Sequence, residues 1–305
     1  MQVRGTFAQL YDNIDKDITA ILRDTLQELK PIWPAVFNEQ TSSRKFERTM
    51  TMTPFGDVPL KPEGNAYTLD LIRAGYTKDF THLEFGMGFA VTETALEDDQ
   101  YDVLVRNAEW LAFSARVVEE KYAAAVFNNG FGTETTGDGL SLFNSAHTLA
   151  GGGTFRNTLS VAADLSTASL MTALIDLQTQ TKIESGQLVA PIKDLILYVP
   201  PDLEFTAERI LNSTLMQGTA DNDVNAILTR RNWTILVNPY LTDTDAWFLV
   251  PKSKRMHGIT TYKRVPITNV PSIVDPNTGN LIYKIRFRRS WGAKFPQGVY
   301  ASPGA

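Results

Sequence analysis

The residue types that most often perform chemistry are few and scattered in this sequence. His82, His147 and His257 are the three histidines, and none of them has a second ligand at the spacing of a metal site. We expect each to be a surface histidine or one whose hydrogen bonds are satisfied within the fold. Residues 139–143 read Gly-Leu-Ser-Leu-Phe, which lacks the second glycine of a nucleophile elbow. The sequence also has no Walker loop and no dinucleotide fingerprint.

One acidic stretch has a partial likeness to a cation site. Asp221, Asp223 and Asn225 are spaced like the opening of a calcium-binding loop, but the central glycine and the terminal glutamate are missing. We therefore expect a solvated loop. The chain contains no cysteine, which excludes disulfides, a thiol nucleophile and a thiolate metal site.

Adjacent carboxylates are the remaining candidates for acid/base chemistry. The pairs Asp98/Asp99 and Glu119/Glu120 would point in different directions on a helix, so neither has the geometry of an acid/base pair. We expect both pairs to lie on solvated faces. The sequence thus predicts a protein that is not an enzyme and that needs no metal or cofactor.

The basic cluster of the chain lies near its end. Lys284, Arg286, Arg288 and Arg289 alternate with aromatic and aliphatic residues, and on a strand Arg286 and Arg288 share one face. A single-stranded nucleic acid could use such an arrangement. The net charge of −5 and the pI near 5.3 give the protein no basic field for that purpose. We therefore expect these arginines to pair with carboxylates of the same or a neighbouring chain.

Length and composition indicate a folded protein. The chain has 305 residues, enough for one large domain or two smaller ones, and its apolar fraction of 43% supports a real core. The first 17 residues lack the apolar run of a signal peptide. We expect no membrane association, because no segment approaches the ~20 apolar residues of a membrane span.

The longest predicted element is a helix from Gln100 to Asn129. Its apolar residues recur in steps of three and four, and Asn128, Asn129 and Gly130 supply the stop signal. Such a helix would be a rod of roughly 45 Å. It is either a long core helix or the rod on which a flat, extended subunit is built, and we favour the second. The first row of apolar positions comprises Leu104, Ala108, Leu111, Ala115, Val118, Tyr122 and Ala125, and a second row comprises Val103, Trp110, Val117, Ala124 and Phe127.

Two segments before this helix have the character of appendages. Residues 6–30 predict an amphipathic helix that ends at Pro31, either an ordinary surface helix or an arm that lies on another subunit. Residues 45–89 predict a long hairpin with strands that include Tyr67–Ile72 and Thr81–Phe89, on either side of a loop rich in proline and glycine. A hairpin of this length needs a surface to lie on, either its own domain or a neighbouring copy.

The rest of the chain predicts two mixed regions. Residues 166–250 predict a compact α+β module, with a helix capped by Ser166 or Thr167 and a buried strand over Asp194–Val199. The end of the chain predicts strands on either side of the turn Asp275–Asn280.

The order of these elements resembles a known family. The stretches that carry the resemblance are DGLSLFNSAH at 138–147, DLILYVPPDLEFTAERILNS at 194–213, WTILVNPYLTDTDAWFLV at 233–250 and RFRRSWGAKFPQGVYAS at 286–302. Together they are similar to the major capsid proteins of tailed bacteriophages, which have the Hong Kong 97-type fold that encapsulins share. Within that family, the sequence most resembles the Mu-type major head subunit.

The resemblance implies an α+β fold with an N-terminal arm, an extended hairpin loop, a peripheral domain that carries a long spine helix, and an axial domain. The implied divisions are 1–45 for the arm, 46–88 for the extended loop, 89–165 for the peripheral domain with the spine helix, 166–250 for the axial domain and 251–305 for the return to the peripheral domain. Some relatives carry a fused scaffold and some crosslink a lysine to an asparagine. We expect a separate scaffolding protein and predict no crosslink.

The implied function is that of a major capsid protein. Hexamers and pentamers would assemble in the host cytoplasm into an icosahedral virion shell around double-stranded DNA, without sequence-specific binding. Portal, scaffolding and decoration proteins are the implied partners. The alternatives are an encapsulin-like compartment shell and a monomeric hydrolase with an unrecognised site. The expected contacts between subunits are Arg44, Phe46, Arg48, Phe55, Lys61, Arg73, Lys78, Arg286, Arg288 and Arg289.

Overall fold

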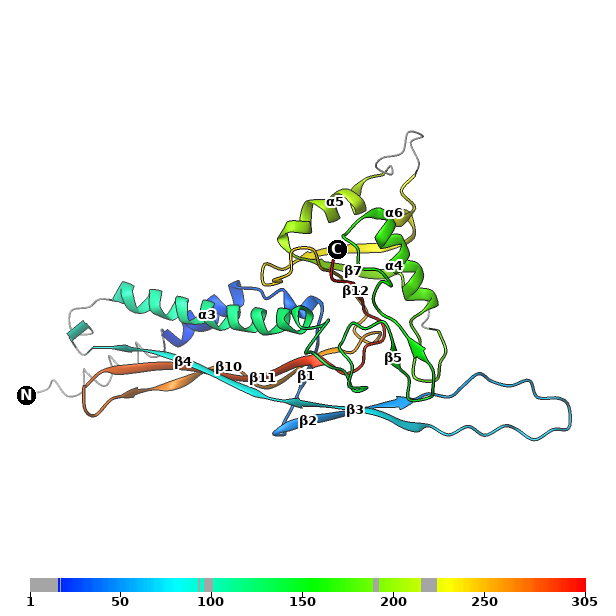
Figure 1. Cartoon of the computed structure of the whole chain (residues 1–305). Helices are drawn as coiled ribbons and strands as arrows, with labels where there is room; N and C mark the ends of the chain where they lie inside the picture. Colours follow the sequence, from blue (N-terminus) through cyan, green and yellow to red (C-terminus); the bar gives the residue numbers. More distant parts are fainter. Residues whose placement is uncertain (1–15, 17, 93, 96–100, 189–191, 215–223) are drawn as a thin grey trace, which may run out of the picture.

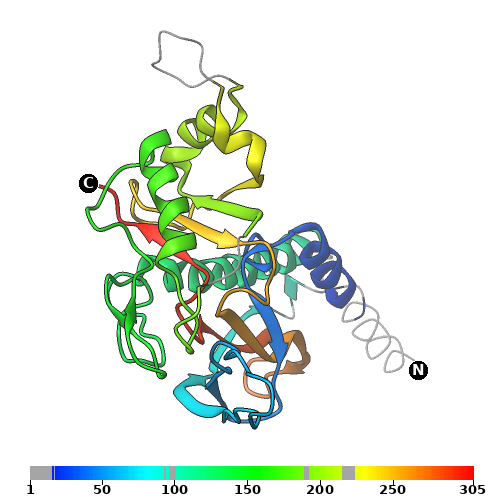
Figure 2. The same ribbon diagram turned by 90° about the vertical axis from the view of Figure 1, so that its right-hand side faces the viewer.

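A computed structural model describes residues 16, 18–92, 94–95, 101–188, 192–214 and 224–305. The molecule has an elongated layer along one side, with a second module standing on it, and a hairpin that extends beyond both (Figure 1). A view from the side shows the module above the elongated layer, with the long helix between the module and the sheet (Figure 2). We call these two parts the upper module and the long layer.

The long layer is a four-stranded sheet covered by one long helix. The strand order is β1-β10-β11-β4, in which β1 runs parallel to β10 and the other neighbours are antiparallel. The strands are β1 (Asn38–Thr41), β10 (Ile259–Val274), β11 (Leu281–Ala293) and β4 (Leu83–Val91). Residues 275–280 form the predicted turn between β10 and β11, which confirms the C-terminal hairpin.

The covering helix is α3 (Tyr101–Asn128), within one residue of its predicted bounds. Its first apolar row packs on the sheet through Leu104, Ala108, Leu111 and Ala115, which are buried with side chains of β11 and of a helix at 18–28. The second predicted row divides along the helix: Ala124 and Phe127 are buried, whereas Val103 and Trp110 are exposed. The helix is therefore a core helix on one face only. Residues 6–15 of the predicted N-terminal helix lie outside the described residues.

The upper module is the predicted α+β unit, and its sheet has the order β12-β9-β7-β8. Ser166 caps the first helix, as predicted, by accepting a hydrogen bond from the amide of Ser169. The strand at the end of the chain pairs with β9, so residues 300–302 belong to this sheet and not to the long layer. The elements are α4 (Thr167–Thr179), β7 (Asp194–Val199), η2 (Pro201–Leu203), α5 (Glu204–Asn212), α6 (Ala226–Arg230), β8 (Asn232–Val237), β9 (Trp247–Pro251) and β12 (Tyr300–Ser302).

Phe127 connects the upper module to the long layer. Alternate residues of β7 face opposite sides, so Leu195, Leu197 and Val199 pack against the helices of the module while Tyr198 faces α3. The ring of Phe127 makes edge contacts with those of Phe37, Tyr198 and Phe248, at centroid distances of 6.1, 4.9 and 5.1 Å. One aromatic side chain at the end of α3 thus touches the N-terminal segment and two strands of the upper module.

The expectation that Glu119 and Glu120 are solvated is wrong, because both are buried. Glu119 pairs with Arg116 at 2.8 Å and with Arg289 at 3.3 Å. Glu120 accepts hydrogen bonds from the amides of Ile32 and Trp33. Ile32 precedes the short helix η1 (Trp33–Ala35), and Trp33 is its first residue. Burial raises the pKa of Glu120. Arg289, Ile32 and Trp33 come from other parts of the chain, and helical spacing alone does not reveal them.

The projecting hairpin consists of β2 (Phe46–Thr53) and β3 (Arg73–Thr81), which pair antiparallel. The strand predicted at Tyr67–Ile72 is wrong, since residues 54–72 form an exposed loop without regular strands. The ladder shifts register between Met50 and Met52. Gly75 lies opposite this irregularity, and a Cβ there would come within 2.4 Å of Thr51 Oγ1. The hairpin therefore requires glycine at the place where its pairing changes.

We expect Phe127→Ala to lower the free energy of unfolding by about 3–5 kcal/mol, because it leaves a cavity at the junction of the two bodies. Phe113→Ala is the matched control on the same helix, since that side chain is 54% exposed, and it should cost less than about 1 kcal/mol. Urea unfolding of the unassembled subunit measures the change in the free energy of unfolding for each variant. Equal effects for the two variants would show that Phe127 does not hold the junction.

Candidate functional site

The outward face of β2 is largely apolar, and the described residues leave about half or more of its larger side chains exposed. Exposure alternates along the strand, with Phe46, Arg48, Met50 and Met52 exposed and the intervening residues partly or fully buried. The face with the larger side chains is therefore the one that points to solvent. A two-stranded hairpin with an exposed apolar face is marginal in water on its own.

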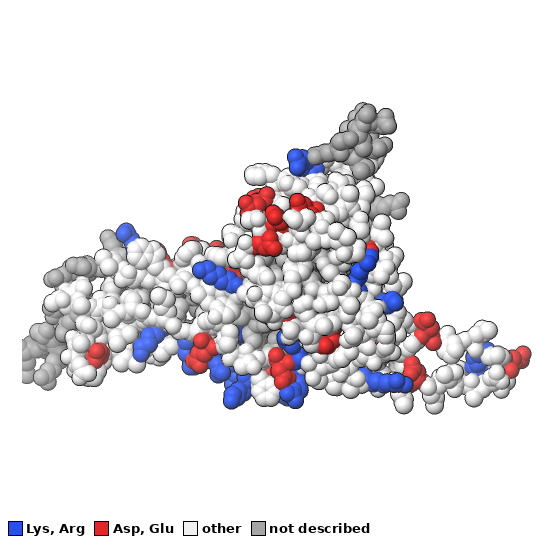
Figure 3. Space-filling view, viewed as in Figure 1, with Lys and Arg blue, Asp and Glu red and all other residues white. Residues whose placement is uncertain are grey.

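The loop at the tip of the hairpin extends the same apolar surface. Leu60 is 94% exposed, although aliphatic residues of this size are usually buried. Most of the projection is uncharged on the face seen in Figure 3. Sequence analysis named only Phe55 and Lys61 here, although aliphatic residues inside a proline- and glycine-rich loop were the available signal. The exposed apolar side chains of the tip are Phe55, Val58, Leu60, Tyr67, Leu69, Leu71 and Ile72.

Local contacts give the tip loop its shape. Asp70 accepts hydrogen bonds from the amides of Gly56 and Leu71, at 3.0 and 2.8 Å, and these bonds lower the pKa of its carboxyl group. The Lys61 ammonium lies 4.7 Å from the centroid of the Tyr67 ring. The loop is thus tied across its width, and Gln187 Nε2 on the body donates a hydrogen bond to Asp57 Oδ1 in the loop, at 2.6 Å.

Ion pairs hold the two strands of the hairpin and join it to the body. Arg48 on β2 makes a two-pronged pair with Asp79 on β3, at 2.7 and 2.6 Å, which raises the pKa of Arg48 and lowers that of Asp79. Lys78 lies 3.5 Å from Glu134 and donates a hydrogen bond to the carbonyl of Thr135. Burial raises the pKa of Glu134 even with Lys78 beside it.

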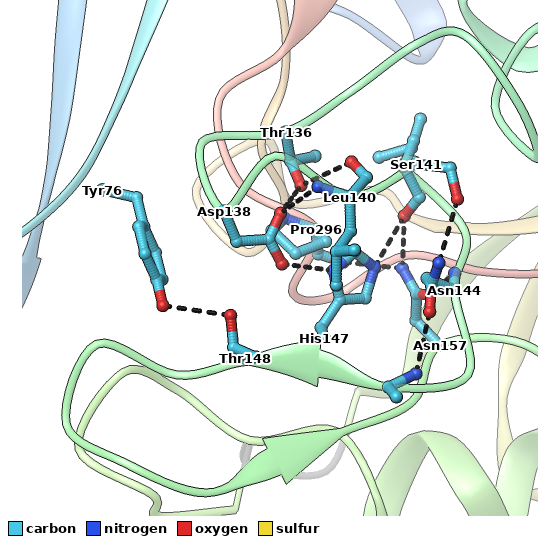
Figure 4. A network of polar contacts seen from close by, with 12 residues as sticks. Tyr76, Thr136, Asp138, Leu140, Ser141, Asn144, His147, Thr148, Asn157 and Pro296 are labelled. Atoms are coloured by element: carbon cyan, nitrogen blue, oxygen red, sulfur yellow. Dashed lines mark hydrogen bonds and ion pairs between the residues drawn. The ribbon is translucent and has the colours of Figure 1, made fainter.

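A long loop that follows α3 supports the base of the hairpin. This loop includes the short strands β5 (His147–Thr148) and β6 (Thr154–Phe155). The hydroxyl groups of Tyr76, on β3, and Thr148, on β5, lie 3.0 Å apart (Figure 4). A Cβ at Gly137 would lie 2.9 Å from Tyr76 Cβ, so the loop and β3 are in close contact.

A buried pair of His147 and Asp138 fixes the shape of this supporting loop (Figure 4). His147 Nδ1 lies 2.7 Å from Asp138 Oδ2, and its Nε2 lies 3.2 Å from the carbonyl oxygen of Leu142. Both partners are acceptors, so a protonated ring can donate to both. Burial alone would raise the pKa of Asp138. Hydrogen bonds from His147, Thr136 and the Leu140 amide outweigh it and keep that pKa below its usual value.

The other predicted site residues have structural surroundings. His82 bonds to the hydroxyls of Ser42 and Ser290, each at 3.0 Å. His257 is buried, which lowers its pKa to about 4. Neither of its ring nitrogens has a hydrogen-bond partner among the described residues, so the expectation of a surface or satisfied histidine is wrong for this residue. Asn225 caps α6 by accepting from the Ile227 amide, while Asp221, Asp223 and the pair at 98–99 lie outside the described residues.

The arginines of β11 pair within their own chain, one of the two possibilities expected. Arg286 and Arg288 each lie 3.8 Å from Glu84 on the neighbouring strand β4. Arg289 is buried, at 3.0 Å from Glu39 and with its guanidinium 4.5 Å from the Trp33 ring. In this structure Arg289 is therefore a residue of the interior and does not present its side chain to a neighbour. Arg44 and Arg73 are exposed near the two ends of the hairpin strands.

A second exposed apolar area lies on the side of α3 that faces away from the sheet. Trp110 is 62% exposed, and Val103 and Phe113 are exposed near it on the same helix. A groove of about 310 Å³ lies nearby, between α3 and the strands β4 and β11. Sequence analysis placed Val103 and Trp110 on the buried face because an apolar row at helical spacing is most often core.

No group of three or more His, Asp or Glu residues in the described part of the chain is close enough to hold a metal ion. Among the same residues, no helix is both long and apolar enough to cross a bilayer. The site residues form an outward, largely apolar projection whose base contacts the body, an arrangement suited to contact with another macromolecule.

Comparison with known proteins agrees with this description. Residues 75–302 match the family model described as "Phage capsid protein". No curated protein matches the sequence.

Solved structures match over most of the chain. The capsid of Ralstonia phage GP4 is 9% identical, with a TM-score of 0.58, and the match covers 88% of this chain and 87% of the other. The virus-like particle from Pyrococcus furiosus is 10% identical, with a TM-score of 0.55 and coverage of 94% and 98%. The procapsid of bacteriophage JBD30 is 14% identical, with a TM-score of 0.53 and coverage of 99% and 76%. At these identities the structures show a shared fold.

We expect Asp138→Asn to lower the free energy of unfolding by about 3 kcal/mol at neutral pH, because it leaves a buried His147 without its charged partner. The pKa of Asp138 is lower in the folded chain than its ordinary value of 3.8. Its contribution is therefore present above that pH and is lost as the pH falls through the folded pKa. Urea unfolding at several pH values should show the difference between wild type and variant narrowing in acid.

Asp79→Asn is the control for this variant, because the Arg48–Asp79 pair is exposed and should contribute less than about 1 kcal/mol. A difference between wild type and Asp138→Asn that stayed constant into strong acid would contradict an ionised Asp138.

Proposed function

Since the chain belongs to the phage capsid protein family, we propose that its copies form hexamers and pentamers, which close an icosahedral shell around double-stranded DNA. The chain is a major capsid protein, a structural subunit of the phage head shell, and its location is the capsid of the virion. Its fold is the Hong Kong 97-like fold. Its place in the Mu-type subgroup stays a prediction.

The observation that carries the proposal is the projecting hairpin. Its outward face and its tip present apolar side chains such as Met50, Met52 and Leu60, which the subunit does not bury itself. Their burial against a second copy would provide the driving force for association. The contact is heterologous, because the projection of one copy meets the body of the next, and repeated rotation closes such contacts into rings.

The base of the hairpin is suited to transmit such a contact. Lys78 and Tyr76 join β3 to the loop after α3, and the buried His147–Asp138 pair makes that loop rigid. The projection therefore holds a defined direction, which reduces the entropy lost when it docks. The expected span of the extended loop, 46–88, includes residues of β4, which belongs to the sheet of the long layer. We therefore propose the shorter span 46–81 for the extended loop and propose that the upper module is the axial domain.

Nine of the expected contact residues remain in the proposal. Arg48 and Lys78 are engaged within the hairpin and its base, so we assign them a positioning role. The others are exposed or partly exposed and can meet a neighbour directly: Arg44, Phe46, Phe55, Lys61, Arg73, Arg286 and Arg288.

The shell has further partners in this proposal. A portal and a separate scaffolding protein, and in some shells a decoration protein, complete the assembly. The net charge of −5 suits a container that does not grip the DNA inside it. We also propose that the chain performs no catalytic step.

An encapsulin-like shell around a cargo protein is the second candidate. The similarity to the virus-like particle from Pyrococcus furiosus favours it only at the level of the fold, since 10% of the residues are identical. The phage capsid family match supports the first candidate more strongly. The nucleic acid content of particles recovered from an infected host separates them, because an encapsulin-like shell would hold protein in place of a packaged genome.

We expect assembly to fail when residues 54–72 are replaced by a short glycine–serine linker. The body should still fold, because these residues are exposed and lie outside both sheets. A milder variant replaces Val58, Leu60, Leu69 and Leu71 with serine and should reduce the yield of shells at least about tenfold. Electron microscopy and sedimentation of the expressed chain measure the yield.

The control replaces Val161 and Ile175, exposed aliphatic residues on the body, with serine. This variant should assemble in normal yield. Closed shells of ordinary size from the chain without its tip would show that the projection is dispensable and would remove the basis of the proposal.

A further inference from the structure

The sheet of the upper module has two ends that carry opposite charge. β9 runs antiparallel to β7, with Leu195 opposite Pro251 and Tyr198 opposite Phe248. The residues before β7 and after β9 therefore meet at one end of the sheet, and those after β7 and before β9 meet at the other. A strand of the length of β7 separates the two ends by about 20 Å.

The end that follows β7 is acidic. Asp202 and Glu204 lie in η2 and at the start of α5, directly after β7. Asp243 and Asp245 lie on the loop that enters β9. Acidic side chains gather on the upper module over this flank, where α5 begins (Figure 3). Phe205 stands among them on α5 and is 82% exposed.

The opposite end is basic. Lys193 directly precedes β7, and the Lys252 amide donates a hydrogen bond to the carbonyl of Asp194, which brings the loop after β9 to the same place. Lys254 and Arg255 are exposed on that loop. The ion pairs between described residues include none of these basic side chains and none of the four acidic ones at the other end.

We propose that the acidic end of the upper module in one copy binds the basic end of the upper module in the next copy within a ring. The occupant of each surface is a second copy of this chain. The partner is indicated by the complementary charge that the same chain carries at the far end of the same sheet. This inference rests on the proposed ring assembly and names the surfaces that meet in it.

The geometry favours a ring contact over two simpler explanations. Acidic residues at the start of α5 also stabilise that helix, which accounts for Asp202 and Glu204. Stabilisation of α5 does not account for Asp243 and Asp245, which lie on a different loop. If these charged side chains served only solubility, acidic and basic residues would be mixed over the whole module. Here, charge of one sign predominates at each end. Phe205 supplies an apolar anchor within the charged contact, as is common at protein interfaces.

Contacts of this kind mainly set orientation and the rate of association. Opposite charges on two ends reject the wrong arrangements, because two acidic ends or two basic ends repel each other. Exposed charges are screened by salt, with a Debye length of about 10 Å at 0.1 M and about 3 Å at 1 M. Ring formation should therefore slow as salt is raised over this range.

The test reverses the charge at each end in the full chain. The acidic-end variant carries Asp202→Lys, Glu204→Lys and Asp245→Lys. The basic-end variant carries Lys193→Glu, Lys252→Glu and Arg255→Glu. A third chain carries all six substitutions, which restores complementarity with the signs exchanged. Assembly from unassembled subunits is followed by light scattering and electron microscopy at low and high salt, with circular dichroism to compare thermal unfolding.

Each single-end variant should assemble at least about tenfold more slowly than wild type, and the chain with six substitutions should recover most of the lost rate. Recovery also shows that the substitutions are compatible with folding. Normal assembly of both single-end variants overturns the inference, as does failure of the chain with six substitutions while it unfolds like wild type. A wild-type assembly rate that salt does not slow overturns it as well. In each of these cases wild-type shells still form, whereas failure of the proposed function would appear as a wild type that forms none.

Discussion

The constraint on which this structure depends is that the subunit exposes apolar surface its own chain does not cover. The loop at 54–72 extends away from the body, and side chains such as Met52 and Leu60 remain largely exposed to solvent. A monomeric protein would gain stability by folding this surface back or by replacing it with polar residues. In the proposed assembly, the stabilising contact comes from the next copy.

Such a projection is useful only if its direction is fixed, and the buried groups of the body serve that end. Glu120 binds the amides that open η1, Glu119 binds Arg289 of β11, and Phe127 packs between the N-terminal segment and the upper module. These contacts lie in the C-terminal part of α3, which acts as the common support of three separate regions. The helix has two roles: one face forms a core with the sheet, and its C-terminal turns join the bodies.

Sequence reasoning recovered the elements whose signal lies within one segment. The bounds of α3, the cap at Ser166 and the turn after β10 all follow from local spacing and turn chemistry. Sequence reasoning failed where the environment of a residue is decided by a partner far away along the chain. Glu120 is buried because its partner Ile32 lies 88 positions earlier, and nothing in the spacing of a helix reveals that. The same limit explains Trp110, an apolar residue at a core-like position that has no sheet opposite it.

Hydrogen–deuterium exchange of free subunits and assembled particles tests the central claim most directly. If the hairpin is completed by a neighbouring copy, the amides of residues 46–81 should exchange much more slowly in the particle than in the free subunit. The core amides of β7 should be protected in both states, because they are paired within the subunit. Equal exchange of the hairpin in the two states would mean that it gains no partner on assembly, and would contradict the account.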